Sequence, residues 1–156
     1  MKTLIFTILI IVSFTGCLDL ALNTIGHIAS GKGKSIHNID VTTLKTQNQK
    51  DAFLRQALIA RNLSKMEELI EVGANVDNKV TYYTGSTDIT PLIEVCNNIL
   101  KDIENRTFYL DVIELLLSKG ANPNQTDPQG KNPLMILKGS NPDAIDILIK
   151  YGAKSN

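Results

Sequence analysis

The stretch DVIELLLSKGAN, residues 111–122, decides how the chain folds. Large apolar residues stand seven, four and three positions before Gly120, and they are Ile113, Leu116 and Leu117. Spacings of three and four place such residues on one face of a helix. Glycine ends a helix readily, because it adopts the left-handed backbone conformation at little cost. The stretch therefore predicts an amphipathic helix that is closed by glycine.

The same pattern occurs twice more in the chain. The closing triplet returns as Gly-Ala-Asn at residues 73–75 and, in degenerate form, as Gly-Ala-Lys at residues 152–154. The corresponding positions before these two glycines are also large and apolar: Met66, Leu69 and Ile70, and then Ile145, Leu148 and Ile149. Copies of one helical unit cannot bury their apolar faces alone, so they stack on one another. We therefore expect three stacked copies.

A further helix precedes each of these helices. It opens with Thr-Pro-Leu at residues 90–92 in the second copy and with Asn-Pro-Leu at residues 132–134 in the third. Thr or Asn caps the free backbone amides, and proline suits the first helical position because no donor is needed there. The first copy has Ala-Phe-Leu at residues 52–54, which keeps the apolar residue and loses the cap. In the same copy, Ser64 and Glu67 predict a capping box for the second helix.

Together these residues resemble the ankyrin repeat, in which Thr-Pro-Leu opens a first helix and Gly-Ala-Asp or Gly-Ala-Asn follows a leucine-rich second helix. Residues 127–134 follow its turn-to-helix signature closely, whereas Ile93 and Met135 stand where the family has histidine. The resemblance implies an all-α fold, a solenoid of about three helix-turn-helix repeats with finger loops. It covers residues 51–156 as a repeat domain, with repeats at about 51–79, 87–126 and 127–156.

The middle repeat is longer than its neighbours. Gly73 and Gly120 are 47 positions apart, whereas Gly120 and Gly152 are 32 apart, close to the family period of about 33. A long finger over residues 77–90 accounts for part of the excess. The remainder lies within residues 96–110, where apolar residues predict that both helices run longer.

Residues 1–16 differ in kind from the rest of the chain. Lys2 precedes an almost unbroken apolar run from Leu4 to Phe14. A run of about 7 to 15 apolar residues is typical of a secretory signal, whereas a membrane-spanning helix needs about 20. The small residues before Cys17 resemble the bacterial lipobox, which implies cleavage before this cysteine and its modification with lipid such as palmitate. The alternative is an incidental Cys17 behind an uncleaved membrane anchor.

The lipobox resemblance implies three parts in the chain. Residues 1–16 are expected to be a lipoprotein signal peptide, residues 17–50 a lipidated cysteine with its tether, and residues 51–156 the repeat domain. The tether shows no sustained helical or strand period, although a short helix over residues 18–28 is an alternative for part of it. The implied location is the bacterial cell envelope, where the lipid anchors the protein at a membrane surface facing the periplasm or the exterior.

Composition argues against nucleic-acid binding and catalysis. The chain has 16 basic and 16 acidic side chains, so no excess charge attracts a polyanion. The predicted repeat domain lacks histidine, because His27 and His37 both lie in the tether. Cys96 stands where ankyrin repeats place a small buried residue, so we expect an inert core thiol rather than a reactive one. We therefore expect no enzyme activity, no cofactor, no metal site and no small-molecule substrate.

Stacked repeats place their fingers and first helices on one concave face, which is a shape suited to protein binding. Tyrosine offers large contact area and a hydroxyl at low entropic cost, and the long finger carries Tyr82, Tyr83 and Asp88. The first helices add Gln56, Glu94, Asn97 and Asn98 on the same side. The alternatives are that one tyrosine packs beneath the finger and that the helical residues form only a solvated surface. Polar residues of the second finger, 125–131, are expected to serve turn geometry.

The leading functional hypothesis is a membrane-anchored adaptor or scaffold that holds a protein partner on the concave face. Family analogy also supports an immunity-type inhibitor of an envelope-acting toxin or enzyme. A structural spacer, and an enzyme whose site the sequence does not display, are the remaining hypotheses. The identity of a co-purifying partner would separate them.

Overall fold

The computed structural model describes residues 36–82 and 86–155. Contacts divide the chain into two units, residues 1–39 and residues 40–156. In the first unit the described element is the 3-10 helix η1 (Ile36–Asn38). The α-helices and the strands described below belong to the second unit.

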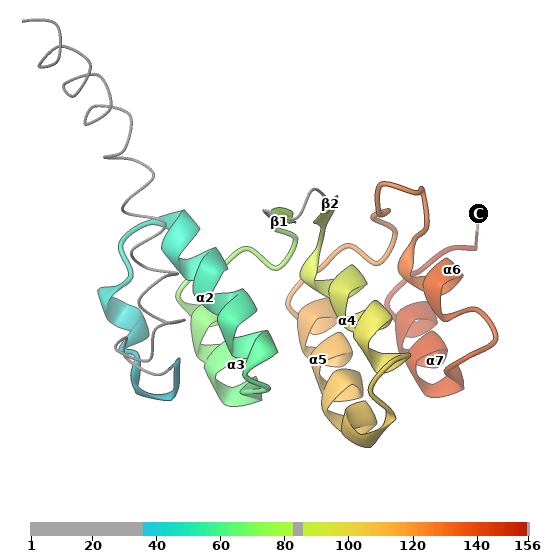
Figure 1. Cartoon of the computed structure of the whole chain (residues 1–156), viewed down its shortest axis with the longest axis horizontal. Coiled ribbons are helices and arrows are strands. Elements are labelled where there is room, and N and C mark those ends of the chain that lie inside the picture. The colour runs from blue at the N-terminus through green and yellow to red at the C-terminus, as the bar shows by residue number, and fades with distance from the viewer. Residues whose placement is uncertain (1–35, 83–85, 156) are drawn as a thin grey trace, which may run out of the picture. The chain divides into compact units, whose positions relative to one another are not determined.

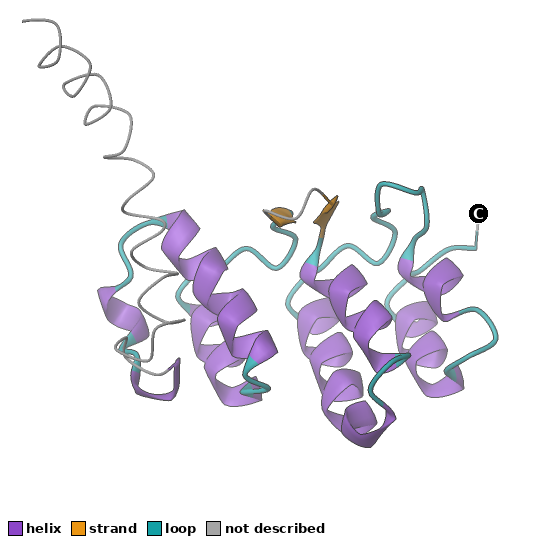
Figure 2. Cartoon of the chain, in the orientation of Figure 1, coloured by secondary structure: helices purple, strands orange, loops and turns teal. Residues whose placement is uncertain are grey.

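Three helical pairs make up the second unit (Figures 1 and 2). They are α2 (Gln47–Ile59) with α3 (Leu63–Glu71), α4 (Pro91–Ile99) with α5 (Arg106–Ser118), and α6 (Pro133–Leu137) with α7 (Pro142–Lys150). Figure 1 shows α2, α4 and α6 in one layer, here termed the inner helices, and α3, α5 and α7 in another, the outer helices. This arrangement confirms the predicted all-α solenoid of helix-turn-helix repeats.

A glycine in the left-handed conformation ends each outer helix. The φ angle is 95° at Gly73, 93° at Gly120 and 87° at Gly152. In each case the amide of the next alanine donates to the carbonyl five residues earlier, at 2.9, 2.9 and 3.0 Å. Because the closing geometry is the same three times, the three triplets are structurally equivalent, as predicted.

Side-chain caps begin the inner helices of the second and third repeats where the sequence predicts them. The Thr90 side chain accepts a hydrogen bond from the amide of Ile93, and the Asn132 side chain accepts one from the amide of Met135. Asn141 caps the last outer helix in the same way. A proline follows each of these caps at the start of its helix, where its lack of a donor is harmless.

Removal of the Thr90 cap provides a test of this local design. The side chain is buried, and its loss leaves the Ile93 amide without its acceptor. Thr90→Ala is therefore expected to lower the free energy of unfolding by about 1 kcal/mol in urea denaturation followed by circular dichroism. Thr107→Ala, at an exposed position of α5, is the control and should change this free energy far less. Equal losses would contradict the role of the cap.

The start of the first outer helix differs from the prediction. Asn62 directly precedes α3 and caps it, so the capping box expected from Ser64 and Glu67 is wrong. Arg61 has already turned the chain, with a φ angle of 53°. Because asparagine is as good a cap as serine, the helix begins at the earliest position that the turn allows.

The first inner helix, α2, begins earlier than predicted, and it does not lack a cap. Thr46 and Gln49 form a capping box ahead of it. Val41, in the 3-10 helix η2 (Val41–Thr43), and Leu44 are buried in the same unit. Residues 40–50 therefore belong to the folded unit, whereas the predicted boundary between tether and repeats was at residue 51. Val41 and Leu44 are isolated apolar residues in a polar stretch, so their spacing did not predict a helix or a strand.

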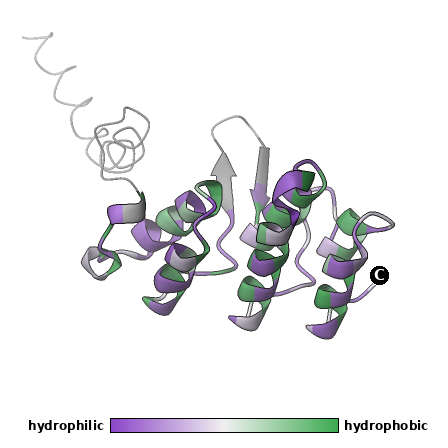
Figure 3. Ribbon diagram, turned by 90° about the horizontal axis from the view of Figure 1, so that it is seen from below, coloured by the Kyte–Doolittle hydropathy of each residue, from purple (hydrophilic) through white to green (hydrophobic). Residues whose placement is uncertain are grey.

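The apolar positions of the outer helices pack into the core between the layers. Met66 and Ile113 are fully buried, and Ile145, at the equivalent position of α7, is half-buried. Ile149 is 56% exposed, so its expected place in the core is wrong. In the part of the chain that the structure describes, no other side chain covers Ile149 to the extent that Leu148 is covered. Figure 3 shows hydrophobic and hydrophilic residues along the same helices, as amphipathic packing requires.

Hydrogen bonds at the bases of the fingers register each repeat on the next. Both carboxylate oxygens of Asp77 accept from the Asn122 amide at 3.1 Å. The side chain of Asn124 accepts from the Lys154 amide at 2.8 Å. Asp77 and Asn124 each stand four residues after the closing glycine of their repeat. The same contact therefore joins the first repeat to the second and the second to the third.

The additional residues of the middle repeat form a hairpin and a longer outer helix. In the finger, β1 (Val80–Tyr82) pairs antiparallel with β2 (Ser86–Ile89), and Val80 lies opposite Ile89. Helix α5 has 13 residues, whereas α3 and α7 have nine each, which confirms the predicted extension of the outer helix. The prediction that both helices run longer is wrong for the inner helix, because α4 has nine residues and α2 has 13. The 3-10 helix η3 (Ile103–Asn105) leads directly into α5 and takes up further residues.

Candidate functional site

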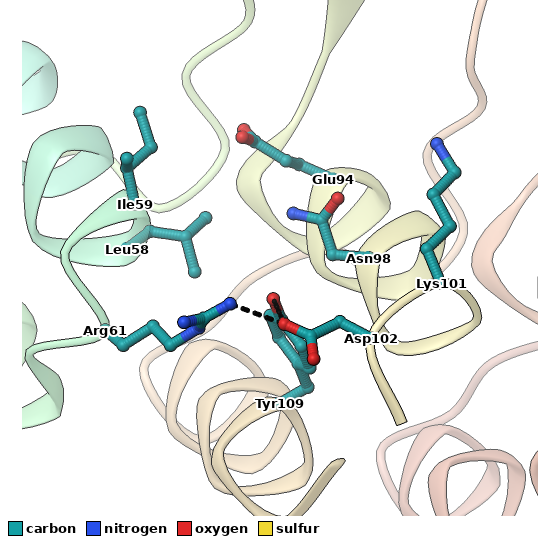
Figure 4. A pocket seen from close by; sticks show the side chains of 8 residues that line it. All are labelled: Leu58, Ile59, Arg61, Glu94, Asn98, Lys101, Asp102 and Tyr109. Atoms are coloured by element: carbon teal, nitrogen blue, oxygen red, sulfur yellow. Dashed lines mark hydrogen bonds and ion pairs between the residues drawn. The ribbon is translucent and has the colours of Figure 1, made fainter. Parts of the chain in front are cut away.

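Two clefts flank the inner helix α4. The first cleft lies between α2 and α4 and has a volume of about 320 Å³ (Figure 4). It is lined by Leu58, Ile59, Arg61, Glu94, Asn98, Lys101, Asp102 and Tyr109. The second cleft lies between α4, α6 and the second finger and has a volume of about 410 Å³. It is lined by Ile89, Asn97, Leu100, Asp127, Gln129, Lys131, Met135 and Ile136. The inner helices, the fingers and these clefts together form a surface that we term the inner face.

In the first cleft the carboxylate of Asp102 is engaged from several sides. Asn105 donates to both of its oxygens, at 2.8 and 3.0 Å, and the Tyr109 hydroxyl donates at 3.1 Å. Arg61 forms an ion pair with it at 2.5 Å, which Figure 4 shows as a dashed line. The Asn105 hydrogen bond, followed by those of Tyr109 and Arg61, lowers the pKa of Asp102. Asp102 is therefore ionised at neutral pH. Through its ion pair with Arg61, it connects the turn after α4 to the end of α2.

Above this network, a buried ion pair fixes the long finger between two inner helices. Arg55 of α2 lies 2.6 Å from the carboxylate of Glu94, and their side chains are only 7% and 13% exposed. The same guanidinium donates to the backbone carbonyls of Asn78 at 3.0 Å and of Ile89 at 2.5 Å. These carbonyls flank the hairpin, so one arginine joins α2, α4 and both ends of the finger.

The role of Arg55 was not foreseen from the sequence. It lies next to apolar residues of a helix, where an arginine usually marks a solvated face, and its acidic partner is 39 positions away. The sequence offered one indication of a buried role, namely that Arg55 is a single charged residue within a mostly apolar stretch. Glu94, predicted as a partner-binding residue, has this internal role; a contact with a partner remains a prediction.

The second cleft has an apolar floor and a polar rim. Leu100 and Met135 are 38% and 37% exposed, and Ile136 lies half-buried beside them. Asp127 is held in the finger turn, because its carboxylate accepts from the amides of Gln129 at 2.9 Å and Lys131 at 2.8 Å. The predicted turn function of this finger is therefore present, and the same residues also line the cleft.

The structure distributes the predicted partner-binding residues over the inner face. Asn98 lies in the first cleft and Asn97 in the second, whereas Gln56 is half-buried on α2 outside the residues that line either cleft. Asp88 is exposed on β2, and Tyr82 belongs to β1. Tyr83 and the proposed lipidation site Cys17 lie outside the described residues.

Exposed apolar side chains mark the inner face, and sequence reasoning missed them. Among the described residues five large hydrophobic side chains are exposed, and three of them line the clefts: Ile59, Leu100 and Met135. The other two, Ile103 in η3 and Ile149 in α7, line neither cleft. Met135, which replaces the histidine of the resembled family, gave the clearest available signal. Exposed apolar groups on one face are typical of interaction surfaces.

Cys96 lies in the core of the second repeat and is fully buried. Burial raises the pKa of its thiol to about 12, because the charged thiolate would lose its hydration. Native protein at pH 8 should therefore react with a thiol reagent only as fast as it opens, and in urea the thiol should react at once. The contribution of the neutral thiol to the free energy of unfolding should be fully present below pH 9, and it should be lost as the pH rises toward 12. Rapid reaction without urea would contradict this account.

Within residues 36–82 and 86–155, no helix is long and apolar enough to cross a membrane. The same part of the chain contains no group of three or more His, Cys, Asp or Glu residues that could hold a metal ion.

Comparison with known proteins agrees with the repeat structure. The ankyrin-repeat family model matches residues 87–128, which nearly coincide with the predicted second repeat. A curated relative, the ankyrin repeat, SAM and basic leucine zipper domain-containing protein 1 of Dasypus novemcinctus, is 26% identical over 138 residues. The match covers 73% of this chain and 29% of that relative, so the chain spans less than a third of the relative's length. Ankyrin repeats bind protein partners in general, and no catalytic family is indicated.

Proposed function

We propose that this chain, an ankyrin-repeat solenoid, is a protein-binding module that holds its partner on the inner face. The observation that carries the proposal is the grouping of exposed apolar side chains beside two clefts on that face. An exposed apolar side chain costs free energy in water, and a partner that covers it recovers this free energy.

The distribution of charge supports the same face. The outer helices α3, α5 and α7 carry seven acidic and three basic side chains. The inner helices α2, α4 and α6 carry two of each. Interfaces are depleted in charge at their centres, whereas a charged surface stays in water. The outer face is therefore suited to solvent and the inner face to contact.

A pair of charge-matched variants tests which face binds. Asn97→Arg with Asn98→Arg places two large cations on α4, one for each cleft. Ser64→Arg with Thr107→Arg places two on exposed positions of the outer helices, with the same change in net charge. We expect the inner-face variant to lose the proteins that co-purify specifically with the full chain, as measured by quantitative mass spectrometry, while the outer-face variant keeps them. Circular dichroism confirms that both variants are folded. Loss of the partner in the outer-face variant alone would contradict the proposal.

The long finger provides a second test of the same proposal. Its tyrosines suit an interface because each brings large contact area and a hydroxyl. The double variant Tyr82→Ala, Tyr83→Ala is expected to reduce recovery of the specific partner. If it recovered the same proteins in the same amounts as the unchanged chain, the finger would have no part in binding. The inner helices would then bind alone.

We further propose that lipid on Cys17 anchors the module in the bacterial cell envelope. The support is the apolar run from Leu4 to Phe14, followed by small residues directly before the cysteine. Metabolic labelling with an alkyne analogue of palmitate should label the chain, and Cys17→Ser should abolish the label and release the protein from membranes. An unlabelled wild-type chain would contradict the anchor and leave the binding proposal intact.

The identity of the partner separates two functions of the module. A co-purifying toxin would identify the module as an inhibitor; other partners would identify an adaptor.

A further inference from the structure

We propose that the two clefts flanking α4 bind one acidic, amphipathic helix of the partner. One apolar side chain of that helix fills the first cleft, and a second, seven positions further along, fills the second cleft. Carboxylates beside these two residues pair with Lys101 and Lys131. This inference rests on the proposed function, since it assigns a partner chemistry to the same face.

The charges that line the clefts point to an acidic partner. In the first cleft both carboxylates are engaged inside the protein, Glu94 by Arg55 and Asp102 by Arg61 together with neutral donors. In the second cleft one oxygen of the Asp127 carboxylate accepts two backbone amides, so the group keeps its charge but is held in the finger turn. Two cations of the clefts have no such contact among the described residues, and they favour a ligand of opposite charge.

Lys101 and Lys131 are these cations, one in each cleft. Both residues are exposed. Neither ammonium group takes part in an ion pair with the described residues, whereas the lysines at 65, 119 and 150 each contact a glutamate. A carboxylate of the partner beside either lysine would gain attraction without breaking an existing pair. Electrostatic complementarity of this kind favours an acidic segment over a basic one.

The floors of the clefts require apolar side chains between these carboxylates. In the first cleft, Leu58, Ile59 and Tyr109 provide the apolar surface. In the second it comes from Leu100, Met135 and Ile136. Ile59 is the most exposed of these six, at 61%. Met135 is unbranched and flexible, so it can adapt to the shape of the side chain that covers it.

The distance between the clefts favours a helix. The clefts occupy successive grooves between neighbouring inner helices, whose axes pack about 8–10 Å apart. In a helix, residues seven positions apart share one face and are separated by about 10.5 Å. In an extended strand, residues on one face are about 7 Å apart at two positions and about 13 Å apart at four. The helical spacing is the better match, and anchors at such spacing are typical of helices bound in grooves.

A synthetic helix provides the probe for this inference. The probe is a fluorescent, alanine-based peptide of 18 residues with leucine at positions 6 and 13 and glutamate beside each leucine. We expect it to bind the full chain in fluorescence anisotropy, and Lys101→Glu with Lys131→Glu to weaken binding by at least about tenfold. Lys119→Glu with Lys150→Glu, which makes the same charge change at the ends of two outer helices, is the control and should bind as tightly as the unchanged chain.

Two further peptides separate the apolar and the charged contributions. In the first of these, the second leucine is moved to position 11, which takes it off the shared face and should weaken binding. In the second, glutamine replaces the glutamates, so the lysine variants should no longer change the affinity. Equal binding of all three peptides, or an unchanged affinity in the double lysine variant, would overturn the inference. Full displacement of the peptide by heparin with no preference for the leucine spacing would instead indicate a polyanion site and also overturn it. If the peptide inference failed while the Asn97 and Asn98 variant still lost its cellular partner, the inner-face proposal would stand.

Discussion

Arg55→Ala is expected to lower the free energy of unfolding by about 3–5 kcal/mol. The guanidinium is buried and satisfies the carboxylate of Glu94 and two carbonyls at the base of the finger. Its removal leaves the buried carboxylate of Glu94 without this cation, and the desolvated charge makes the loss larger than that of one exposed attraction. Because small domains are stable by only about 5–15 kcal/mol, the first repeat should separate from the second at low urea concentrations.

Two controls identify the cause of this loss. Arg61→Ala also removes an arginine that bridges the first two repeats, but the side chain of Arg61 is 49% exposed and should matter far less. Replacing both Arg55 and Glu94 by methionine removes the uncompensated charge and should recover part of the stability. Urea denaturation followed by circular dichroism measures all of these variants. A larger loss for Arg61→Ala than for Arg55→Ala would contradict the assignment.

Ile113→Ala is expected to lower the free energy of unfolding by about 2–5 kcal/mol, because it leaves a cavity in the middle layer. Ile113 is fully buried between the first and third repeats. The same substitution at Ile145, the equivalent position in the last layer, should cost clearly less because that side chain is only half-buried. The difference between these two variants measures the stacking of repeats directly. Equal losses at both positions would contradict the layered packing, and the same urea titrations decide the matter.

The repetition in the sequence made most of the fold predictable. A helix end at Gly120 could be placed because glycine, three apolar positions and their spacing all agreed, and the same agreement recurred at Gly73 and Gly152. The caps at Thr90 and Asn132 followed from residue types that are strongly preferred there. These features depend on local backbone chemistry, which a sequence displays directly.

The parts that could not be predicted depend on contacts between distant residues. Nothing near Arg55 in the sequence identifies Glu94 as its partner, since the pair forms only when two repeats stack. Ile149 has the same local pattern as Leu117, which is buried, and nothing in that pattern shows that Ile149 is exposed. The candidate site shows the same limit, because the exposure of Ile59 and Met135 beside the clefts follows from how the inner helices stack, which no local pattern displays.

Hydrogen exchange on the complex with the co-purified partner tests the central proposal most directly. We expect slower exchange on binding for amides near the end of α2, along α4 and in α6 with the second finger. Amides of α5 and α7, on the outer face, should exchange as fast as in the free chain, apart from a uniform gain in stability. Protection that is confined to the outer helices, with the inner helices unchanged, would contradict binding at the inner face.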